Sequence, residues 1–359
     1  MTRDAPRGTI QRTMGRIFSI ASVVLIALSF LVSTGRAAPI TGSDTPGIGS
    51  GVEPERRIPP PLPPEKQRTR HSREEQDRWE APRKDIPDKM RLASFQSDIV
   101  HRFVSYMVYL PPGYDRIKNE NMRYPVIYML PTFGDCRENG PLVGKINESI
   151  EAGEMPPVIV VSVQGIYGSM YTDAKDRGRP IESVTVRELV TRVDSTYRTI
   201  PDREHRALEG FAMAGFGAAH LGFKYPDVFG VVSMFAPMLG PMEAMQDEMP
   251  QLVSDVWGDD RRYFADNDPW NLVARNANQI RGKMKIRLYC GDQDRYAVYA
   301  EDFHARLNQL GIEHEYILVP GGKHNLNLLL GAVRERVLNY WKEVFPPYVP
   351  PATTQSSGL

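Results

Sequence analysis

The sequence predicts an α/β fold in which a mostly parallel, twisted sheet has helices on both faces and an antiparallel start. Between residues 92 and 345, short apolar runs alternate with stretches that carry apolar residues at three- and four-residue spacing. This alternation is typical of buried parallel strands that are connected by helices. Residues 103–110 instead follow the pattern of a strand with one exposed face and end in a Pro-Pro-Gly turn, which favours an antiparallel first strand.

The buried strands are predicted from continuous apolar runs, because a strand covered on both faces of the sheet has no polar side. Six runs have this character: residues 125–130, 158–163, 207–211, 228–235, 286–289 and 315–319. Apolar residues at helical spacing predict helices at residues 184–197, 213–224, 300–310 and 328–344.

The first 38 residues predict a secretory signal peptide. Four arginines precede an apolar run at residues 17–32, and the small residues Gly35 and Ala37 follow it. The run is short for a membrane span, and an uncleaved N-terminal anchor is the alternative. We therefore expect a protein that is secreted, periplasmic or held at the cell envelope.

Residues 39–91 are rich in proline, glycine and charged side chains. Such a segment buries too little apolar surface to offset its ordering entropy, so it predicts a disordered linker. A proline-rich spacer would hold the folded part away from a membrane or wall, and a recognition site for proline-binding modules is the alternative. The tail at residues 346–359 is predicted to be disordered for the same reason. One folded domain at residues 92–345 remains.

Composition excludes several classes of function. The chain has 359 residues with 44 Lys+Arg and 44 Asp+Glu, so no net charge favours nucleic-acid binding. Cys136 and Cys290 are too few for a disulfide scaffold and are expected to be free. We expect no cofactor. We also expect no metal, because five histidines lack the spacing of common metal sites and are interpreted as surface or packing residues. These are His101, His205, His220, His304 and His314.

A predicted strand runs directly into a predicted helix through the small-residue stretch 210–215, Gly-Phe-Ala-Met-Ala-Gly. This is the layout of a nucleophile elbow, in which a G-x-S-x-G turn projects a serine hydroxyl above the edge of the sheet. For so short a motif, a strand–helix packing turn without a reactive group is the alternative.

Two candidate partners follow the elbow in the chain. Asp294 comes just after the predicted strand at 286–289, and His324 lies in the loop after the strand at 315–319. Open α/β sheets form their sites at the carboxyl ends of their strands. The order elbow, acid, histidine is that of the α/β-hydrolases, in which the acid orients the base and the base takes the proton of the nucleophile.

With these motifs the sequence resembles the putative esterase family of α/β-hydrolases, which includes esterase D, feruloyl and acetylxylan esterases, and the mycolyltransferases. The likeness extends from Phe95 to Phe345. It rests on residues 108–114 (VYLPPGY), 168–173 (GSMYTD), the elbow with residues 223–229 after it, and the segments around Asp294 and His324. The resemblance implies the α/β-hydrolase fold, with Asp294 as triad acid and His324 as triad base, although Lys323 interrupts the usual Gly-Gly-His run.

The chain departs from the family pattern at the reactive position. Relatives carry G-x-S-M-G-G where this chain carries G-F-A-M-A-G, so Ala212 occupies the nucleophile position. A methyl group cannot attack a carbonyl, and no acyl-enzyme forms there. Residues 131–134, Pro-Thr-Phe-Gly, replace the His-Gly run of relatives. The backbone amides of Met213 and Phe133 are the predicted oxyanion donors. Departures at 131–132, 212 and 214, together with the intact signal peptide, favour a naturally degenerate copy over the alternative of an engineered inactivation at Ala212.

We therefore expect an exported pseudo-esterase whose cleft retains Asp294 and His324 and binds a carbohydrate ester, a lipid ester or a protein partner. The first alternative is an active esterase or acyltransferase with another nucleophile. The second is a structural envelope module. Methionines between residues 238 and 249 predict either a cap over the cleft or ordinary helix packing. The candidates for another nucleophile are Thr132, Cys136, Ser169, Ser233 and Cys290.

Overall fold

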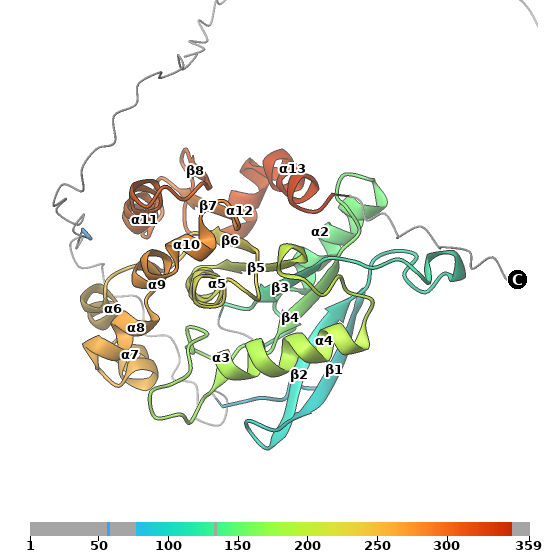
Figure 1. Cartoon of the computed structure of the whole chain (residues 1–359), viewed down its shortest axis with the longest axis horizontal. Helices are drawn as coiled ribbons and strands as arrows, with labels where there is room; N and C mark the ends of the chain where they lie inside the picture. The colour runs from blue at the N-terminus through green and yellow to red at the C-terminus, as the bar shows by residue number, and fades with distance from the viewer. Residues whose placement is uncertain (1–55, 58–76, 133–134, 347–359) are drawn as a thin grey trace, which may run out of the picture. The chain divides into compact units, whose positions relative to one another are not determined.

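The computed structural model describes residues 56–57, 77–132 and 135–346, and Figure 1 shows their arrangement. The described residues build an eight-stranded sheet in the order β1-β2-β4-β3-β5-β6-β7-β8. Strands β1 (Met90–Ser97) and β2 (Arg102–Tyr109) are antiparallel, and β2 is antiparallel to β4 (Ile159–Val163). All other neighbouring strands are parallel. The predicted α/β-hydrolase type of fold and its antiparallel start are confirmed.

Strands are present at the six predicted places, although β8, at the edge of the sheet, is only partly buried. Besides β4, they are β3 (Val126–Leu130), β5 (Arg206–Phe211), β6 (Val231–Phe235), β7 (Lys285–Gly291) and β8 (Glu315–Val319). Strand β1 was not predicted, because its sequence MRLASFQS has no continuous apolar run and its burial alternates irregularly.

The folded domain begins before the predicted boundary at Leu92, which lies inside β1. Trp79 and Ala81 are buried, and both are tied to Ser105 of β2. The Ser105 amide donates to the Trp79 carbonyl at 2.9 Å, and the Ala81 amide donates to the Ser105 hydroxyl at 3.0 Å. A single tryptophan among charged residues gave too weak a signal to predict this attachment. The predicted signal peptide, most of the linker and residues 347–359 lie outside the described residues.

Helices cover both faces of the sheet, as predicted (Figure 1). On one face, α5 (Met213–Lys224), α4 (Val190–Thr196) and α11 (Ala297–Gln309) enclose the larger apolar core. On the other face, α2 (Gly140–Glu151) and α13 (Arg334–Val344) enclose a smaller core. The short helix α12 (Leu326–Ala332) packs through Leu329 against Phe235, Tyr289 and Val319. Helix α4 continues a segment that starts with α3 (Ile181–Ser183) and a π-helical turn, η2 (Val184–Leu189). Two short 3-10 turns are η1 (Ile117–Asn119) and η3 (Arg203–His205).

A helical insertion separates β6 from β7. Its helices are α6 (Met242–Glu248), α7 (Pro250–Trp257), α8 (Arg261–Asn267), α9 (Pro269–Arg275) and α10 (Ala277–Ile280). Met238, Met242 and Met245 are at most 5% exposed. These methionines are buried, which both explanations offered by the sequence allow.

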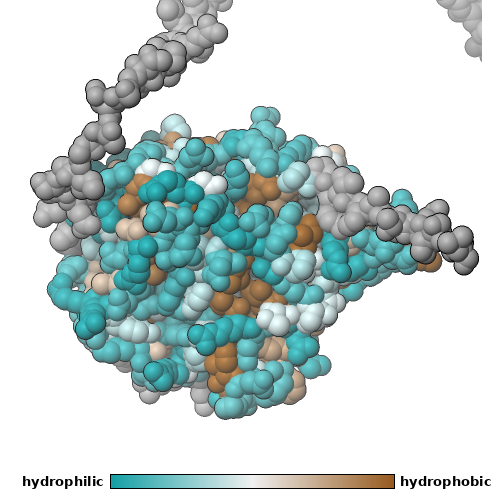
Figure 2. All heavy atoms as spheres, viewed as in Figure 1, coloured by the Kyte–Doolittle hydropathy of each residue, from teal (hydrophilic) through white to brown (hydrophobic). Residues whose placement is uncertain are grey.

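The surface is mainly hydrophilic on the face shown in Figure 2, with a narrow apolar strip near the middle of the view. None of the helices in the described part of the chain is long and apolar enough to span a membrane. Cys136 and Cys290 are free cysteines, as expected, and both are buried.

Candidate active site

The elbow is built where β5 passes into α5. Ala212 has φ 54° and ψ −117°, a positive φ that is uncommon for a residue with a side chain. Its amide donates to the Phe235 carbonyl at 3.0 Å, and its carbonyl accepts from the Met238 amide at 3.2 Å. Both bonds link the elbow to β6 and to the loop after it. The strained turn is thus present and fixed, with a methyl group at its tip.

Gly210 makes this turn possible by bringing the end of β5 against the first turn of α5. A Cβ atom at Gly210 would lie 2.1 Å from the carbonyl oxygen of Ala214. Gly215 faces Pro237, and a Cβ there would lie 3.0 Å from two Pro237 carbons. Ala214, which departs from the family's glycine, has its methyl fully buried. The elbow therefore depends on glycine at 210, while alanine is accommodated at 214.

Asp294 and His324 meet above the carboxyl ends of β7 and β8. The Nδ1 atom of His324 lies 2.8 Å from Oδ2 of Asp294. The other oxygen, Oδ1, accepts from the Tyr296 amide at 2.8 Å. The Asp294 side chain is 0% exposed, whereas the His324 side chain is 30% exposed. A buried carboxylate thus holds an accessible imidazole through Nδ1, which leaves Nε2 free to face a reactant, as in a triad.

Two glycines hold the loops that carry this pair. A Cβ atom at Gly291 would lie 2.2 Å from the carbonyl oxygen of Gly322, so neither backbone tolerates a side chain at the crossing. The Gln293 amide donates to that same carbonyl at 2.9 Å, and the Asp292 amide donates to Val319 at 3.0 Å. Gly291 and Gly322 therefore fix the position of Asp294 relative to His324, and Lys323 does not prevent the contact between these two side chains.

Two aromatic rings, which the sequence did not single out, enclose the imidazole of His324. Phe211 stacks on it at a centroid distance of 4.5 Å and an interplanar angle of 29°. Tyr296 presents its edge at 5.1 Å and 79°. Since Phe211 directly precedes Ala212, this stacking places the base beside the elbow. In the sequence, Phe211 lies next to the elbow and Tyr296 lies two residues after Asp294. That these rings contact His324 could not be predicted, because ring packing depends on tertiary contacts.

Of the two predicted oxyanion donors, the Met213 amide lies in the described part of the chain and the Phe133 amide does not. Met213 is the first residue of α5, so its amide has no acceptor within the helix. Phe133 lies outside the described residues. The preceding Thr132 donates its amide to Glu138 Oε1 at 2.8 Å and its hydroxyl to the Phe211 carbonyl at 3.3 Å. Thr132 therefore joins the loop after β3 to the elbow through its side chain, a contact that glycine at this position could not make.

The other candidate nucleophiles are engaged elsewhere. Burial raises the pKa of Cys136 to about 12 and raises that of Cys290 further, so both remain thiols at neutral pH. Ser169 is buried, and its hydroxyl accepts from the Tyr171 amide at 3.2 Å. Ser233 is also buried and donates to Glu209 at 2.9 Å. In the described part of the chain, His324 is hydrogen-bonded to Asp294, and neither the two thiols nor the two serine hydroxyls are hydrogen-bonded to His324.

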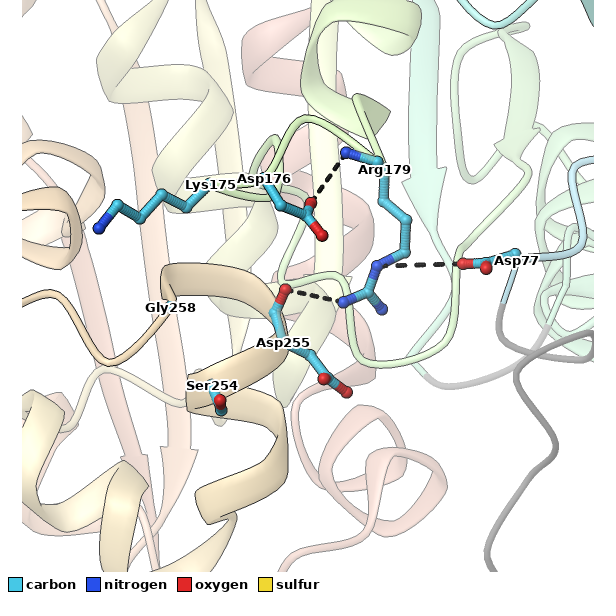
Figure 3. Close-up of a pocket in the computed structure, with 8 residues that line it drawn as sticks. Asp77, Lys175, Asp176, Arg179, Ser254, Asp255 and Gly258 are labelled. Carbon is cyan, nitrogen blue, oxygen red and sulfur yellow. Dashed lines mark hydrogen bonds and ion pairs between the residues drawn. The ribbon is translucent and has the colours of Figure 1, made fainter.

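Two cavities differ in size and in the residues that line them. A crevice of about 10 Å³ lies between Met238, Met245 and Tyr296, and it is too small for more than one water. A polar cavity of about 590 Å³ lies between residues 175–179 and α7, and Figure 3 shows Arg179 reaching across it toward Asp77 and Asp255. Arg179 donates to the Asp255 carbonyl at 2.8 Å. The triad positions do not line this polar cavity.

Four of the five histidines that the sequence assigned to surface or packing roles have partners outside the site. His304 Nδ1 and His314 Nε2 lie 2.7 Å apart, His205 pairs with Asp202 at 2.6 Å, and His220 is fully buried beside Glu182. Among residues 56–57, 77–132 and 135–346, no group of three or more His, Cys, Asp or Glu side chains is arranged to hold a metal ion.

Comparison with known proteins decides the family. The model of the family described as "Putative esterase" matches residues 97–327, a stretch that contains the elbow, Asp294 and His324. The chain belongs to the putative esterase family. An endo-1,4-beta-xylanase/feruloyl esterase of Xylanibacter ruminicola is 30% identical over 41% of this chain and 22% of its own length. An esterase of Mycobacterium tuberculosis is 24% identical over 64% of this chain and 54% of its own length. The chain thus spans about half or less of these relatives.

Solved structures agree on the fold. A ferulic acid esterase superposes with a TM-score of 0.60 at 20% identity, covering 72% of this chain and 99% of its own. An S-formylglutathione hydrolase from Agrobacterium tumefaciens superposes with a TM-score of 0.56 at 18% identity, covering 71% of this chain and 94% of its own. At these identities the likeness shows the shared fold alone.

Proposed function

We propose that this protein is an exported member of the putative esterase family that binds an ester-bearing carbohydrate or lipid, or a protein partner, without efficient hydrolysis. The observation that carries the proposal is the methyl group of Ala212 on an otherwise intact elbow, beside a paired Asp294 and His324. The scaffold of a serine esterase is present, and the atom that would be acylated is missing.

The chemistry that remains is limited. His324 has Asp294 behind it but no hydroxyl proton to accept at position 212, so a covalent acyl intermediate cannot form there. Direct attack by water with His324 as general base is left. In a serine protease, loss of the nucleophile lowers turnover by about two millionfold, and only binding and oxyanion donors contribute afterwards. Any hydrolysis by the natural chain is therefore expected to be a residual activity.

The class of ligand is argued from the relatives. The relatives reported above include a xylanase/feruloyl esterase and a ferulic acid esterase, both named for esters of an aromatic acid. Aromatic side chains line the candidate site of this chain, where Phe211 and Tyr296 enclose His324. These rings suit an acyl group with an apolar or aromatic body. The predicted signal peptide supports export to a place where polysaccharide or envelope esters are found.

The two alternatives, an active esterase and a structural envelope module, require different features of the site. An active esterase needs another nucleophile beside His324. The hydroxyls of Ser169 and Ser233 are hydrogen-bonded to other groups, and the thiols of Cys136 and Cys290 stay protonated, so none of them fits this role. A structural envelope module needs no cleft, and Ala212 itself is only 2% exposed. The accessible edge of His324, 30% exposed, favours a ligand site over a purely structural module.

The test is a paired assay on short acyl esters and on feruloylated and acetylated sugars. We expect the natural protein to bind at least one ester without appreciable turnover, and Ala212→Ser to raise kcat by about a thousandfold or more. Ala212→Gly, which alters the same residue without adding a hydroxyl, is the matched control and should stay inactive.

The contrary outcomes are distinct. Efficient turnover by the natural protein that disappears in His324→Ala would refute the impaired-enzyme proposal. Failure of every ester to bind, measured by calorimetry with the natural protein, would favour the structural module. Activity in Ala212→Ser that is lost in the Ala212→Ser/His324→Ala double variant would establish His324 as the base of the restored reaction.

A further inference from the structure

A second candidate site lies between the helical insertion and α11. Helix α9 contributes Trp270 and, at its N-cap, Asp268, whose side chain is 3% exposed. Helix α11, which packs against α9 (Figure 1), contributes Glu301 and Asp302. Val298, Glu301 and Asp302 share one face of α11, because they are three and four residues apart. The site thus combines three carboxylates with the face of an indole ring.

Arg56 of the N-terminal segment occupies the buried half of this site. Its Nη1 and Nη2 atoms donate to the two oxygens of Asp268 at 2.8 and 2.9 Å, a bidentate pair. The guanidinium also lies over the Trp270 ring at 4.9 Å. Arg306 approaches the same ring at 5.3 Å. With 12% exposure, the Arg56 side chain is nearly withdrawn from solvent, so its charge is compensated by a specific partner.

Arg57 occupies the exposed half. Its Nε donates to Asp302 at 2.6 Å, its Nη2 donates to Glu301 at 3.1 Å, and its backbone amide donates to Asp302 at 3.1 Å. These bonds raise the pKa of Arg57 above its ordinary value. Because a backbone amide takes part as well as the side chain, the contact fixes the path of the chain and not only one guanidinium.

We propose that Asp268, Trp270, Glu301 and Asp302 form a docking site for a pair of consecutive arginines, occupied in cis by Arg56 and Arg57. The dipeptide and the hydrolase domain belong to one compact unit. Docking moves the attachment point of the N-terminal segment from Trp79 to Arg56, 23 residues nearer the start of the chain. At full extension those residues would span about 80 Å, so the docked pair shortens the reach of any N-terminal tether by up to that amount.

The test is limited trypsin digestion of the full-length protein, with cleavage after Arg56 and after Arg57 followed by mass spectrometry. Both peptide bonds require an arginine side chain to leave the site, so their cleavage reports the undocked population. We expect the Asp268→Asn/Asp302→Asn variant to be cleaved at these bonds at least about tenfold faster than the natural chain. Asparagine retains a side-chain oxygen for the N-cap of α9, which preserves the helix start.

The matched control is Asp266→Asn, which removes an exposed pair with Arg275 on the same insertion and should leave the cleavage rate unchanged. Cleavage after Arg287, whose side chain is fully buried, reports global unfolding. If the double variant unfolds, Asp302→Asn alone tests the Arg57 half. Equal cleavage of the natural chain and the docking variants would overturn the proposal. Protection that disappears on dilution would assign the site to a second copy and overturn docking in cis.

Discussion

At the scale of single residues, the elbow combines a strained backbone with a methyl side chain at its tip. Ala212 holds φ 54° and ψ −117°, and a residue in such a region costs about 1–3 kcal/mol. The contacts that impose this conformation are all structural: Gly210 against Ala214, and the hydrogen bonds from Ala212 to Phe235 and Met238. The packing of β5 against α5 therefore determines the turn, and the side chain at its tip can change from serine to alanine without dismantling it.

Gly210→Ala tests this explanation. The added Cβ would lie 2.1 Å from a backbone oxygen that cannot rotate away, so we expect a loss of about 3 kcal/mol in the free energy of unfolding. Gly144→Ala is the matched control in helix α2, where nothing lies within 4 Å of an added Cβ, and it should stabilise by about 0.5–1 kcal/mol. Urea unfolding of the three proteins measures both changes. Similar stabilities for Gly210→Ala and the natural chain would contradict the explanation.

At the scale of secondary-structure elements, the sheet brings the site together at the carboxyl ends of β5, β7 and β8. Helix α5, which begins at the elbow, is anchored further along by a buried cluster. His220 Nε2 lies 2.8 Å from Glu182 of α3, and His220 Nδ1 lies 2.7 Å from the Asn267 carbonyl. Lys224 approaches Glu182 at 2.7 Å. This cluster joins α3, α5 and the insertion, and so holds the helix that carries the Met213 amide.

Glu182→Gln is predicted to destabilise the protein in a pH-dependent manner. Burial alone would raise the pKa of Glu182, but the pairs with His220 and Lys224 outweigh it and hold the pKa below its ordinary value of 4.5. A lowered carboxyl pKa gives stability that is complete above about pH 5 and is lost as the pH falls toward the folded-state pKa. We expect Glu182→Gln to lower the free energy of unfolding by about 3 kcal/mol at pH 7.

The measurement is urea unfolding at pH 7 and at pH 3.5. The gap between the natural chain and Glu182→Gln should narrow at the lower pH, because the unfolded chain then protonates Glu182 while the folded chain still holds it charged. Glu204→Gln, which alters an exposed pair with Arg203, is the control and should change little at either pH. A gap that widens in acid would show that the sign of the shift is wrong.

At the scale of the whole molecule, sequence patterns predicted the parallel part of the sheet and the order of the site. Continuous apolar runs such as Val231–Phe235 indicate buried strands because they are too short for typical helices and alternate with stretches of helical spacing. Asp294 and His324 were predicted because they follow such strands. Strand β1, the anchor at Trp79 and the docking of Arg56 were missed, since each depends on partners distant in the chain. The signal peptide and the role of Phe133 remain predictions.

The central claim is that this esterase-family chain retains the acid and the base but lacks the atom that becomes acylated. Labelling of the purified natural protein with a fluorophosphonate probe, measured by intact mass, tests it most directly. We predict no stoichiometric adduct on the natural chain and one adduct per molecule on Ala212→Ser, mapped to residue 212. A stoichiometric adduct on the natural protein would contradict the account, and its position would identify the nucleophile.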